Sequence, residues 1–360
     1  MKAVAVQRGE TEPTLINIPQ PTPNDGEVLV RTLRVGIDGT DHEVISGPHG
    51  GYPEGADYQI LGHEAVGVVV DPTTTKFSEG DLVVPTVRRP PESGSTLYFD
   101  RDEPDMAPGG DYVERGIVGA HGYMSEYFTS PERFLVPVPE SLAVYGFLVE
   151  PISNAEKAIE HAFAARSDFE WTPESGFVLG NGPLGLLALA ILEQDRGVYG
   201  RFDRTYCLGR RDEPDLTIDI IRRLGSTYVD SRETPLTEMP GVHEPVDFVF
   251  EATGYARHVF ETVDTLAPNG VAVLLGISED WSFGIDGGRL HREMVLENKA
   301  LIGSVNSHVD HFEAAKESLS AFPHWFIDDL ITGVHAPEEA SRAFETGDDI
   351  IKTVVEFDTL

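Results

Sequence analysis

The sequence predicts an α/β protein of two domains, a β-rich domain followed by a doubly wound parallel-sheet domain. The chain has 360 residues, more than one typical domain needs, and 40% of them are hydrophobic, which is enough to bury substantial cores. Short apolar or alternating runs fill the first half, whereas strand-like and helix-like runs alternate from about Glu150 onward. Such alternation is typical of a parallel sheet with crossover helices.

The β-rich half starts at the N-terminus. Residues 1–6 form a short apolar run followed at once by charged residues, as expected of a strand and not of a signal peptide. Turns rich in Pro, Gly and Asp separate the expected strands, which cover residues 3–6, 27–33, 67–70 and 82–85. Residues 88–110 carry few apolar side chains, so we expect an exposed lobe or long loop there.

The second half has the pattern of crossover units. The expected strands cover residues 177–180, 205–208, 246–250 and 271–276, and the expected helices cover residues 184–193 and 216–224. A last helix at residues 311–320 and a terminal strand at residues 352–357 follow.

A glycine-rich loop joins the first strand and helix of this half. Its sequence is Gly180-Asn181-Gly182-Pro183-Leu184-Gly185. The pattern alone is weak evidence, but its position between a strand and a helix is that of a dinucleotide-binding loop. The first glycine permits a tight turn, the second lets the backbone approach the pyrophosphate, and the third lets helix and strand pack closely. Pro183 suits the first helical turn, whose positive end attracts the pyrophosphate.

The end of the next strand indicates which nicotinamide cofactor is preferred. NAD-selective enzymes usually carry Asp or Glu there, but this chain has Gly209 followed by Arg210 and Arg211. Glycine leaves room for a 2′-phosphate and arginine binds phosphate through paired hydrogen bonds, although both arginines could also be solvated surface residues. We predict NADP over NAD. Further contacts are expected where later strands end, at Ala252, Thr253, Leu275, Gly276, Ile277, Ser304, Val305 and Asn306.

Four side chains form the inventory of a metal site: Asp38, His63, Glu64 and Glu150. A mononuclear zinc that keeps an open position for substrate uses about three protein ligands drawn from Cys, His, Asp and Glu. Glu64 could instead be a buried acid beside the metal, and Glu150 could cap a helix at the domain boundary. The sequence leaves open which of the two glutamates ligates directly.

The motifs together resemble those of the zinc-dependent medium-chain dehydrogenases, and within them the archaeal glucose 1-dehydrogenases. The resemblance covers essentially the whole chain and rests on Gly62-His63-Glu64, Gly80-Asp81, the loop from Gly180 and the block from Glu114 to Glu126. It implies a GroES-like catalytic domain at residues 1–153 and a Rossmann domain that binds the cofactor at residues 154–307. Residues 308–360 then return to the catalytic domain. The family places its active site between the two domains.

The chain departs from the family pattern in three places. The first zinc ligand is normally Cys, but this chain has Asp38. The family's structural zinc is held by four cysteines, yet the only cysteine is Cys207, so no structural zinc is expected. Thr73 lies where Gly or Ala is usual. A shell of oxygen and nitrogen is harder than a thiolate site, so we expect a catalytic zinc that chelators remove readily.

The resemblance also implies a mechanism. Zinc binds the C1 hydroxyl of a sugar and lowers its pKa, hydride passes to the nicotinamide, and Thr40 helps to pass out the proton. The product is gluconolactone. Glu150 contacts both metal and substrate, and the candidates for binding the other sugar hydroxyls are Glu114, Asn154 and Asn306. His121 lies in the family block but has no chemical role that we can assign.

Two other functions fit the same motifs. One is an alcohol, polyol or threonine dehydrogenase of the same family. The other is a nucleotide-binding relative of the quinone oxidoreductases that works without metal, although such relatives lack the zinc residues that this chain has.

Charge restricts the partners further. The formal net charge of -34 argues against nucleic-acid binding, and no apolar run is long enough to span a membrane. We expect a cytoplasmic protein and, from the family, a homodimer or homotetramer. Six lysines against 21 arginines and this acidity resemble proteins of salt-loving archaea, in which salt screens the self-repulsion of the folded chain.

Overall fold

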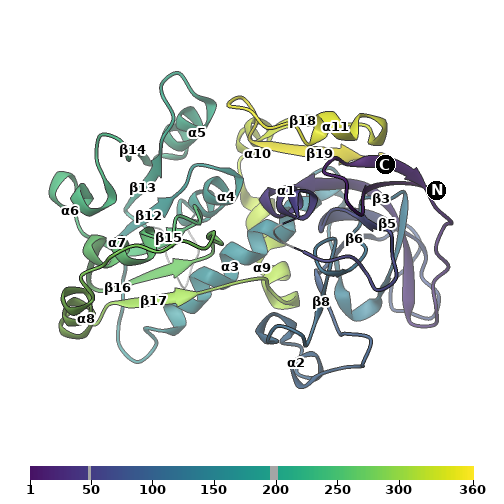
Figure 1. The fold of residues 1–360 in the computed structure, drawn as a ribbon, viewed down its shortest axis with the longest axis horizontal. Coiled ribbons are helices and arrows are strands. Elements are labelled where there is room, and N and C mark those ends of the chain that lie inside the picture. The colour runs from purple at the N-terminus through teal and green to yellow at the C-terminus, as the bar shows by residue number, and fades with distance from the viewer. Residues whose placement is uncertain (48–49, 195–201) are drawn as a thin grey trace. The chain divides into compact units, whose positions relative to one another are not determined.

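The computed structural model describes residues 1–47, 50–194 and 202–360. The chain divides into two compact units, one formed by Met1–Ser153 with Asn306–Leu360 and the other by Asn154–Val305. The chain therefore returns to the first unit at Asn306, slightly earlier than residue 308. Figure 1 shows this return as the yellow C-terminal strands beside the purple N-terminal ones.

The first unit is built on β-sheets. Its largest sheet has the strand order β11-β6-β5-β3-β19-β18, with β10 also paired to β3, and two three-stranded sheets have the orders β2-β1-β4 and β7-β8-β9. The strands are β1 (Lys2–Gln7), β2 (Thr14–Asn17), β3 (Glu27–Ile37), β4 (Tyr58–Ile60), β5 (Glu64–Asp71), β6 (Leu82–Pro85), β7 (Arg88–Arg89), β8 (Val113–Arg115), β9 (Gly119–Ala120), β10 (Tyr127–Pro131), β11 (Leu135–Pro137), β18 (Ile331–His335) and β19 (Lys352–Glu356). Antiparallel pairing of β19 with β3 brings residues from both ends of the chain into one core.

Short helices connect these strands. They are α1 (Gly39–Ser46), α2 (Leu97–Asp100), the 3₁₀ turn η1 (Pro104–Met106), α9 (Val309–Ala321), α10 (His324–Leu330) and α11 (Ala340–Ala343). The helix α1 begins directly after β3, with Asp38 as its N-cap, and ends at Gly47, whose φ of 93° suits glycine. The cap therefore fixes where the chain turns away from the sheet.

The second unit is a parallel sheet. Six strands lie in the order β14-β13-β12-β15-β16-β17, which is the doubly wound order of a Rossmann domain. The strands are β12 (Ser175–Leu179), β13 (Arg204–Gly209), β14 (Thr227–Asp230), β15 (Val246–Glu251), β16 (Leu266–Leu274) and β17 (Ala300–Gly303). The helices are α3 (Val149–Ala164), which starts in the first unit, α4 (Pro183–Leu192), α5 (Leu216–Leu224), α6 (Met239–Val242), α7 (His258–Thr265) and α8 (Gly287–Leu296).

The observed elements confirm the predicted fold class and most of the predicted strands. The strand β6 and the helix α5 have the predicted bounds, whereas β3 runs to Ile37 and β16 starts at Leu266, both longer than expected. The helices α1, α3, α7 and α8 were not expected from the sequence. Thr73 has a φ of 46°, a left-handed conformation that glycine adopts more readily than threonine.

The lobe at residues 88–110 differs from the expectation of an exposed loop. Arg88 and Arg89 are buried, and Phe99 packs with Ala107 and Phe134 in a small core of its own. The expectation was wrong for these residues because composition does not show that a guanidinium group can be buried among carbonyl oxygens and an aromatic ring. Among the described residues, no helix is long and apolar enough to cross a membrane.

Candidate active site

Asp38 and His63 form the centre of a polar cluster in the first unit. One carboxylate oxygen of Asp38 caps helix α1 by accepting from the backbone N–H of Asp41 at 3.0 Å, and the Asp41 carboxylate accepts from the N–H of Asp38 at 3.2 Å. This reciprocal cap orients Asp38 so that its other oxygen, Oδ2, lies 3.5 Å from Nε2 of His63. The cap thus serves both the helix and the site.

Tight backbone packing holds His63 in place. Gly62 precedes it with a φ of 81°, and a Cβ there would lie 2.6 Å from the side chains of Met124 and Val35. A Cβ at Gly116 would lie 2.5 Å from the Gly62 carbonyl oxygen, and one at Gly122 only 2.2 Å from that of Leu61. The turn that follows Glu114 therefore packs directly on the segment that leads to His63.

The two glutamates of the predicted metal site have different surroundings. Glu64, at the start of β5, is buried against Lys352 of β19, whose Nζ lies 2.7 Å from Oε1 and 2.5 Å from Oε2. Glu150 is buried in the first turn of α3, and His63, Glu64 and Glu150 each offer a ligand atom within 4.8 Å of the others. Because Lys352 already neutralises Glu64, the geometry favours Glu150 as the third ligand beside Asp38 and His63.

The electrostatics of the cluster suit a cation. Burial alone would raise the pKa of Asp38, but the charge and hydrogen bond of His63 and the charge of Lys352 hold it well below its usual range. Burial alone would lower the pKa of His63, yet Asp38, Asp41 and Glu150 raise it well above its ordinary value. The carboxylates around the His63 imidazole therefore stabilise its positively charged form, and a metal ion bound there would supply the same charge.

The residues present fit a zinc ion. Zinc binds nitrogen and carboxylate oxygen at about 2.0–2.2 Å, so the ligand atoms of a tetrahedral site lie about 3.4 Å apart. The Asp38 Oδ2 to His63 Nε2 distance of 3.5 Å matches that edge. The other ring nitrogen of His63, Nδ1, is buried without a hydrogen-bond partner among the described residues and lies 3.9 Å from Oδ1 of Asp41.

Asp41 is a residue that the sequence reasoning did not assign. Its carboxylate also accepts from the N–H of Gly62 at 3.1 Å, so it links the start of α1 to the segment that precedes His63. A carboxylate beside the free nitrogen of a ligating histidine fixes the orientation of the ring. Burial raises the pKa of Asp41 to about 7, assisted by Asp38 and opposed by His63. The Asp-x-x-Asp spacing of the capping box was the signal that could have shown it.

The structure places the predicted substrate residues on several different elements. Thr40 is half-buried in the first turn of α1, and Glu114 of β8 accepts through Oε1 from the side-chain amide of Asn306 at 3.4 Å. Asn154 lies one helical turn after Glu150 on α3 but belongs to the second unit. His121, to which no role was assigned, accepts from the N–H of Ile60 at 3.2 Å and stacks on Tyr58, which is a structural role.

The glycine-rich loop has the geometry that dinucleotide binding needs. Gly180 follows β12 with a φ of 110°, Gly182 is the N-cap of α4, and Pro183 occupies the first turn. A Cβ at Gly185 would lie 1.9 Å from the carbonyl oxygen of Gly180, so only glycine permits this contact between helix and loop. The first N–H groups of a helix lack intrahelical partners and can bind a phosphate, and Leu184 lies in this first turn of α4.

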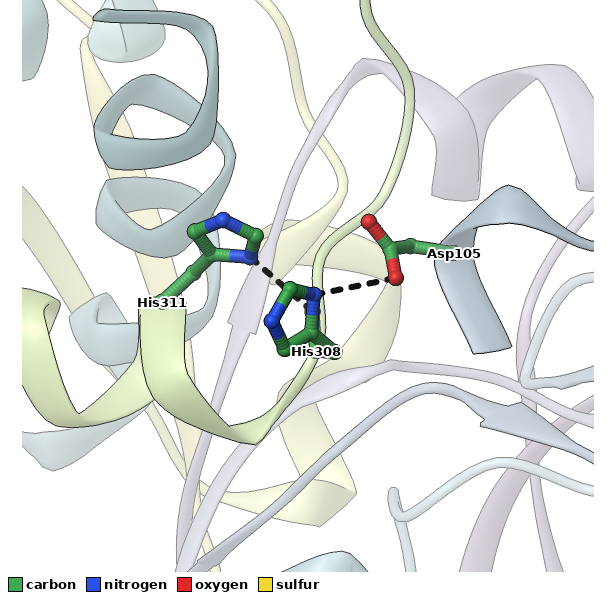
Figure 2. A group of neighbouring side chains, drawn as sticks. All are labelled: Asp105, His308 and His311. Atoms are coloured by element: carbon green, nitrogen blue, oxygen red, sulfur yellow. Dashed lines mark hydrogen bonds and ion pairs between the residues drawn. The ribbon is translucent and has the colours of Figure 1, made fainter. Parts of the chain in front are cut away.

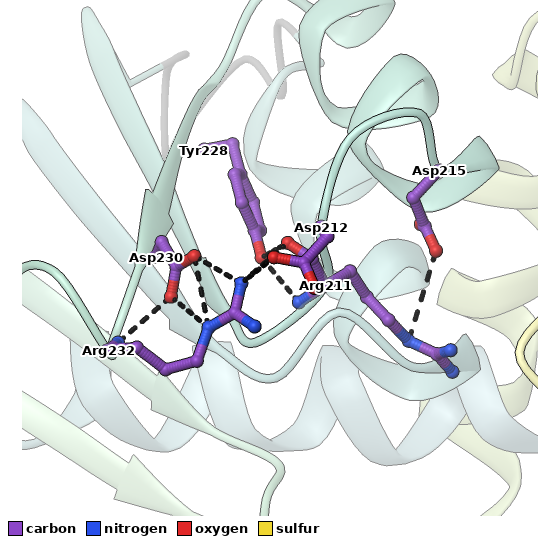
Figure 3. Close-up of polar contacts among 6 residues, drawn as sticks. All are labelled: Arg211, Asp212, Asp215, Tyr228, Asp230 and Arg232. Atoms are coloured by element: carbon purple, nitrogen blue, oxygen red, sulfur yellow. Dashed lines mark hydrogen bonds and ion pairs between the residues drawn. The ribbon is translucent and has the colours of Figure 1, made fainter.

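The end of β13 excludes the acidic residue that NAD selection uses. A Cβ at Gly209 would lie 2.7 Å from the ring of Tyr228 and 2.8 Å from the side chain of Asn181. Figure 3 shows the next residues: the Tyr228 hydroxyl accepts from the N–H of Arg211 at 2.8 Å and donates to its carbonyl oxygen at 3.0 Å. The Arg211 guanidinium lies 4.0 Å from Asp215, and the exposed Arg210 has no hydrogen-bond or ion-pair partner within the described parts of the chain.

A third arginine belongs to the same surface. Arg232 pairs with Asp230 and Asp212 and donates to the carbonyl oxygen of Arg211 at 3.3 Å (Figure 3). It neutralises two carboxylates that would otherwise repel a phosphate beside Arg211. The sequence reasoning stopped at Arg211 because Arg232 follows another strand.

The remaining predicted cofactor residues lie on loops at the same edge of the sheet. Because all six strands are parallel, the loops that follow β12, β13, β15, β16 and β17 emerge at one edge. Glu251 accepts from the N–H groups of Thr253 and Gly254, and a Cβ at Gly276 would lie 2.0 Å from the nitrogen of Gly254. The loops that carry Ala252, Leu275 and Ile277 therefore touch one another. Ser304 and Val305 follow β17, and Asn306 already belongs to the first unit.

Comparison with known proteins agrees with this architecture. Residues 24–140 match the family described as alcohol dehydrogenase GroES-like domain, and residues 143–357 match the family described as glucose dehydrogenase C-terminus. The chain is 62% identical to a glucose 1-dehydrogenase of Haloferax mediterranei and 61% identical to one of Haloarcula marismortui, each over 100% of both chains.

Solved structures give the same result. Haloferax mediterranei glucose dehydrogenase in complex with NADP, Zn and gluconolactone superposes with a TM-score of 0.98 at 62% identity, covering 100% of both chains. A 2R,3R-butanediol dehydrogenase of Bacillus subtilis, 22% identical, shares the fold with a TM-score of 0.80 over 99% of both chains. The chain therefore belongs to the zinc-dependent medium-chain dehydrogenases, in their glucose dehydrogenase family.

Proposed function

We propose that this protein oxidises D-glucose at C1 to gluconolactone and reduces NADP, assisted by one zinc ion. One observation carries the proposal: Asp38 and His63 lie at the spacing of zinc ligands, with Glu150 within reach, in a chain 62% identical to a glucose dehydrogenase whose crystal complex holds NADP, Zn and gluconolactone. The family resemblance alone left alcohol and polyol dehydrogenases open, but five relatives that are 54–62% identical to the chain are named glucose 1-dehydrogenase.

Each residue of the metal cluster then has a role. When bound, zinc supplies a Lewis acid that lowers the pKa of the C1 hydroxyl, and NADP supplies the acceptor of the C1 hydride. Asp38, His63 and Glu150 hold the ion, while Glu64 stays paired with Lys352. Thr40 accepts the hydroxyl proton and passes it toward solvent. Loss of the hydroxyl proton and of the hydride from C1 forms the carbonyl group of the lactone.

Sugar recognition rests on hydrogen-bonding groups at fixed positions. Glu114 accepts from sugar hydroxyls, Asn306 donates through its amide or accepts through its oxygen, and Asn154 adds a further contact. A site built to pair with hydroxyl groups rejects analogues that lack them, because its own polar groups are then left without partners.

Gly209, Arg210 and Arg211 support the preference for NADP. The exposed Arg210 is available for the 2′-phosphate, and Tyr228 fixes the backbone of Arg211 beside it. In an Arg210→Ala variant we expect the KM for NADP to rise about tenfold, as for the loss of a charge-assisted hydrogen bond, with little change in the KM for NAD. An unchanged ratio of the two constants would contradict this assignment.

The test of the function itself is a substrate panel. We expect NADP reduction in molar KCl with glucose, much slower reduction with simple alcohols, and loss of activity on dialysis against EDTA that zinc restores. Comparable rates with ethanol and glucose would show that the substrate assignment is wrong. Full activity after removal of all metal would show that the zinc assignment is wrong.

We further propose a homodimer or homotetramer in the cytoplasm, without a structural zinc. The only cysteine, Cys207, is buried on β13, so the chain uses no disulfide and no thiolate metal cluster. Light scattering in molar KCl measures the assembly, and metal analysis with one zinc per chain is the result that supports a single site.

A further inference from the structure

Two groups of residues outside the metal cluster join Glu114 and Asn306, two of the predicted sugar-binding residues, in a closed ring of contacts. The first group centres on Arg88, which is only 3% exposed although it carries a guanidinium group. Its Nε donates to Oε1 of Glu114 at 3.0 Å, and the guanidinium carbon Cζ lies 3.7 Å from the centre of the Tyr112 ring. A buried arginine in such a position holds its carboxylate partner in one orientation.

Arg88 also holds the turn η1 of the lobe. Its Nη1 donates to the carbonyl oxygen of Asp105 at 2.8 Å and, at longer distances of 3.3 and 3.4 Å, to those of Pro104 and Ala107. One guanidinium group therefore joins the lobe to Glu114, so that the orientation of the Glu114 carboxylate depends on the position of η1.

The second group, shown in Figure 2, joins the same turn to the segment that carries Asn306. Oδ1 of the buried Asp105 lies 3.0 Å from Nδ1 of His308, and the N–H of His308 donates to Nδ1 of His311 at 3.3 Å. His308 is the N-cap of α9 and lies two residues after Asn306. Asp105 therefore fixes the start of α9 and, with it, the left-handed turn at Asn306, whose φ is 56°.

Asn306 closes the ring. Its amide Nδ2 donates to Oε1 of Glu114 at 3.4 Å, the same oxygen that Arg88 binds, and its Oδ1 accepts from the N–H of Ser307 at 2.8 Å. Both protein donors thus use Oε1, and within the described chain no donor reaches Oε2 of Glu114. The carboxylate is held by one oxygen and presents the other.

Asp105, His308 and His311 are also residue types that ligate metals, and each offers a ligand atom within 4.8 Å of the others. The contacts in Figure 2 are those of a capped helix start, however, and a cation would meet the positive end of the α9 dipole. Hydrogen bonding explains these contacts without an ion.

We propose that Arg88 and the Asp105–His308 pair are positioning residues that set the geometry with which Glu114 and Asn306 recognise the sugar. The proposal rests on the proposed function, since it takes Glu114 as a substrate contact. The lobe of residues 88–110 then acts as a brace for substrate specificity. Displacing a positioned group by about 1 Å can reduce catalytic efficiency by about a hundredfold, so loss of this brace has a measurable effect.

The test uses Arg88→Lys, which keeps the charge but cannot bind Glu114 and the η1 carbonyls together, and His308→Gln as an independent variant of the second link. We expect the KM for glucose to rise about tenfold in each, with kcat within about threefold and the Kd for NADP unchanged. Arg34→Lys is the matched control, because Arg34 also joins a carboxylate, Glu356, to a carbonyl, that of Val144, away from the ring. Its KM should equal that of the wild type.

A double-mutant cycle separates this proposal from the proposed function. If Arg88 acts through Glu114, then Arg88→Lys has little further effect on the KM in a Glu114→Gln background. An unchanged KM in Glu114→Gln itself would refute the substrate role of Glu114. The positioning role would be refuted if Glu114→Gln raises the KM and Arg88→Lys then raises it by the same factor in the Glu114→Gln background as in the wild type.

Two further readouts complete the test. The variants should also discriminate less between glucose and its deoxy analogues, which a general loss of stability would not produce. Metal content should remain the same in His308→Gln and in the wild type after equilibration with zinc. Loss of one zinc per chain in His308→Gln would overturn the hydrogen-bonded brace and identify the cluster as a metal site.

Discussion

The buried pair of Lys352 and Glu64 makes the sharpest prediction about stability. Both side chains are 1% exposed, and Nζ lies within 2.7 Å of both carboxylate oxygens. The Lys352→Met substitution keeps an unbranched side chain of nearly the same length but leaves the buried carboxylate of Glu64 without its ion-pair partner. A Cβ at Gly36 would lie 2.1 Å from Oε2 of Glu64, so the pocket has no room for the carboxylate to move toward β3.

The expected cost follows from this burial. Removing one partner of a buried ion pair costs about 3–5 kcal/mol, and in a unit of about 200 residues each kcal/mol corresponds to about 2–4 °C in Tm. We therefore expect the free energy of unfolding to fall by about 3–5 kcal/mol and the Tm to fall by about 6–20 °C. The loss of an exposed pair, such as that of Lys2 with Glu338, should have little effect on stability in a Lys2→Met control.

The loss should also depend on pH. Burial raises the pKa of Glu64 and Lys352 opposes this shift, so without Lys352 the pKa rises further. A glutamate whose pKa is raised in the folded state binds more protons there than in the unfolded state. The variant should therefore lose stability as pH rises from the ordinary pKa of glutamate to the raised value, and be closest to the wild type at acid pH.

Urea unfolding in metal-free molar KCl, followed by circular dichroism, measures the effect. The double variant Lys352→Met with Glu64→Leu should recover most of the stability, because two apolar side chains replace an ion pair at little net cost. A loss below about 1 kcal/mol in Lys352→Met, or a double variant no more stable than the single one, would refute the reasoning.

Three further predictions concern the cofactor, the metal and salt. The Tyr228→Phe substitution removes both hydrogen bonds to the Arg211 backbone, so it should weaken binding of 2′,5′-ADP about fivefold, which corresponds to about 1 kcal/mol. Binding of 5′-AMP, which lacks the 2′-phosphate, should not change. Equal effects on the two ligands in calorimetry would contradict a role at the phosphate. The pKa of His63 is raised well above its ordinary value in the metal-free protein, so zinc binding near neutral pH should release a proton. The affinity for zinc should therefore increase with pH. Heats of zinc binding that are the same in all buffers would contradict this prediction. With a net charge of -34, the Tm should rise steadily with KCl, and equal Tm values in dilute buffer and in molar salt would disprove halophilic stabilisation.

Local rules of the chain predicted much of the cofactor domain. The turn conformation requires glycine at position 180, and close contact with the Gly180 carbonyl oxygen requires glycine at position 185. Because the two residues are only five positions apart, their sequence pattern is sufficient to identify the loop. The bounds predicted for helix α5 agree with the structure, in which Asp215 caps its start and Gly225, with a φ of 106°, ends it. Such signals act between neighbours in the chain and need no knowledge of the tertiary fold.

The metal cluster was predicted as an inventory but not as an arrangement. Asp38, His63, Glu64 and Glu150 were identified from the sequence, yet only the fold pairs Glu64 with Lys352, which lies 288 residues away, and so favours Glu150 as a ligand. Arg88 was assigned to an exposed lobe, because composition does not show which oxygen atoms will surround a guanidinium group.

Motifs in the sequence were enough to predict the family, the two kinds of domain, the nucleotide loop and the lack of an acidic residue at Gly209. Which side chains meet became clear only from the folded chain: Asn306 with Glu114, 192 residues apart, Lys352 with Glu64, and Asp105 with His308. Backbone conformation and helix capping depend on adjacent residues. A buried charge, in contrast, is stabilised only by a partner that the packing of distant strands brings within hydrogen-bonding distance.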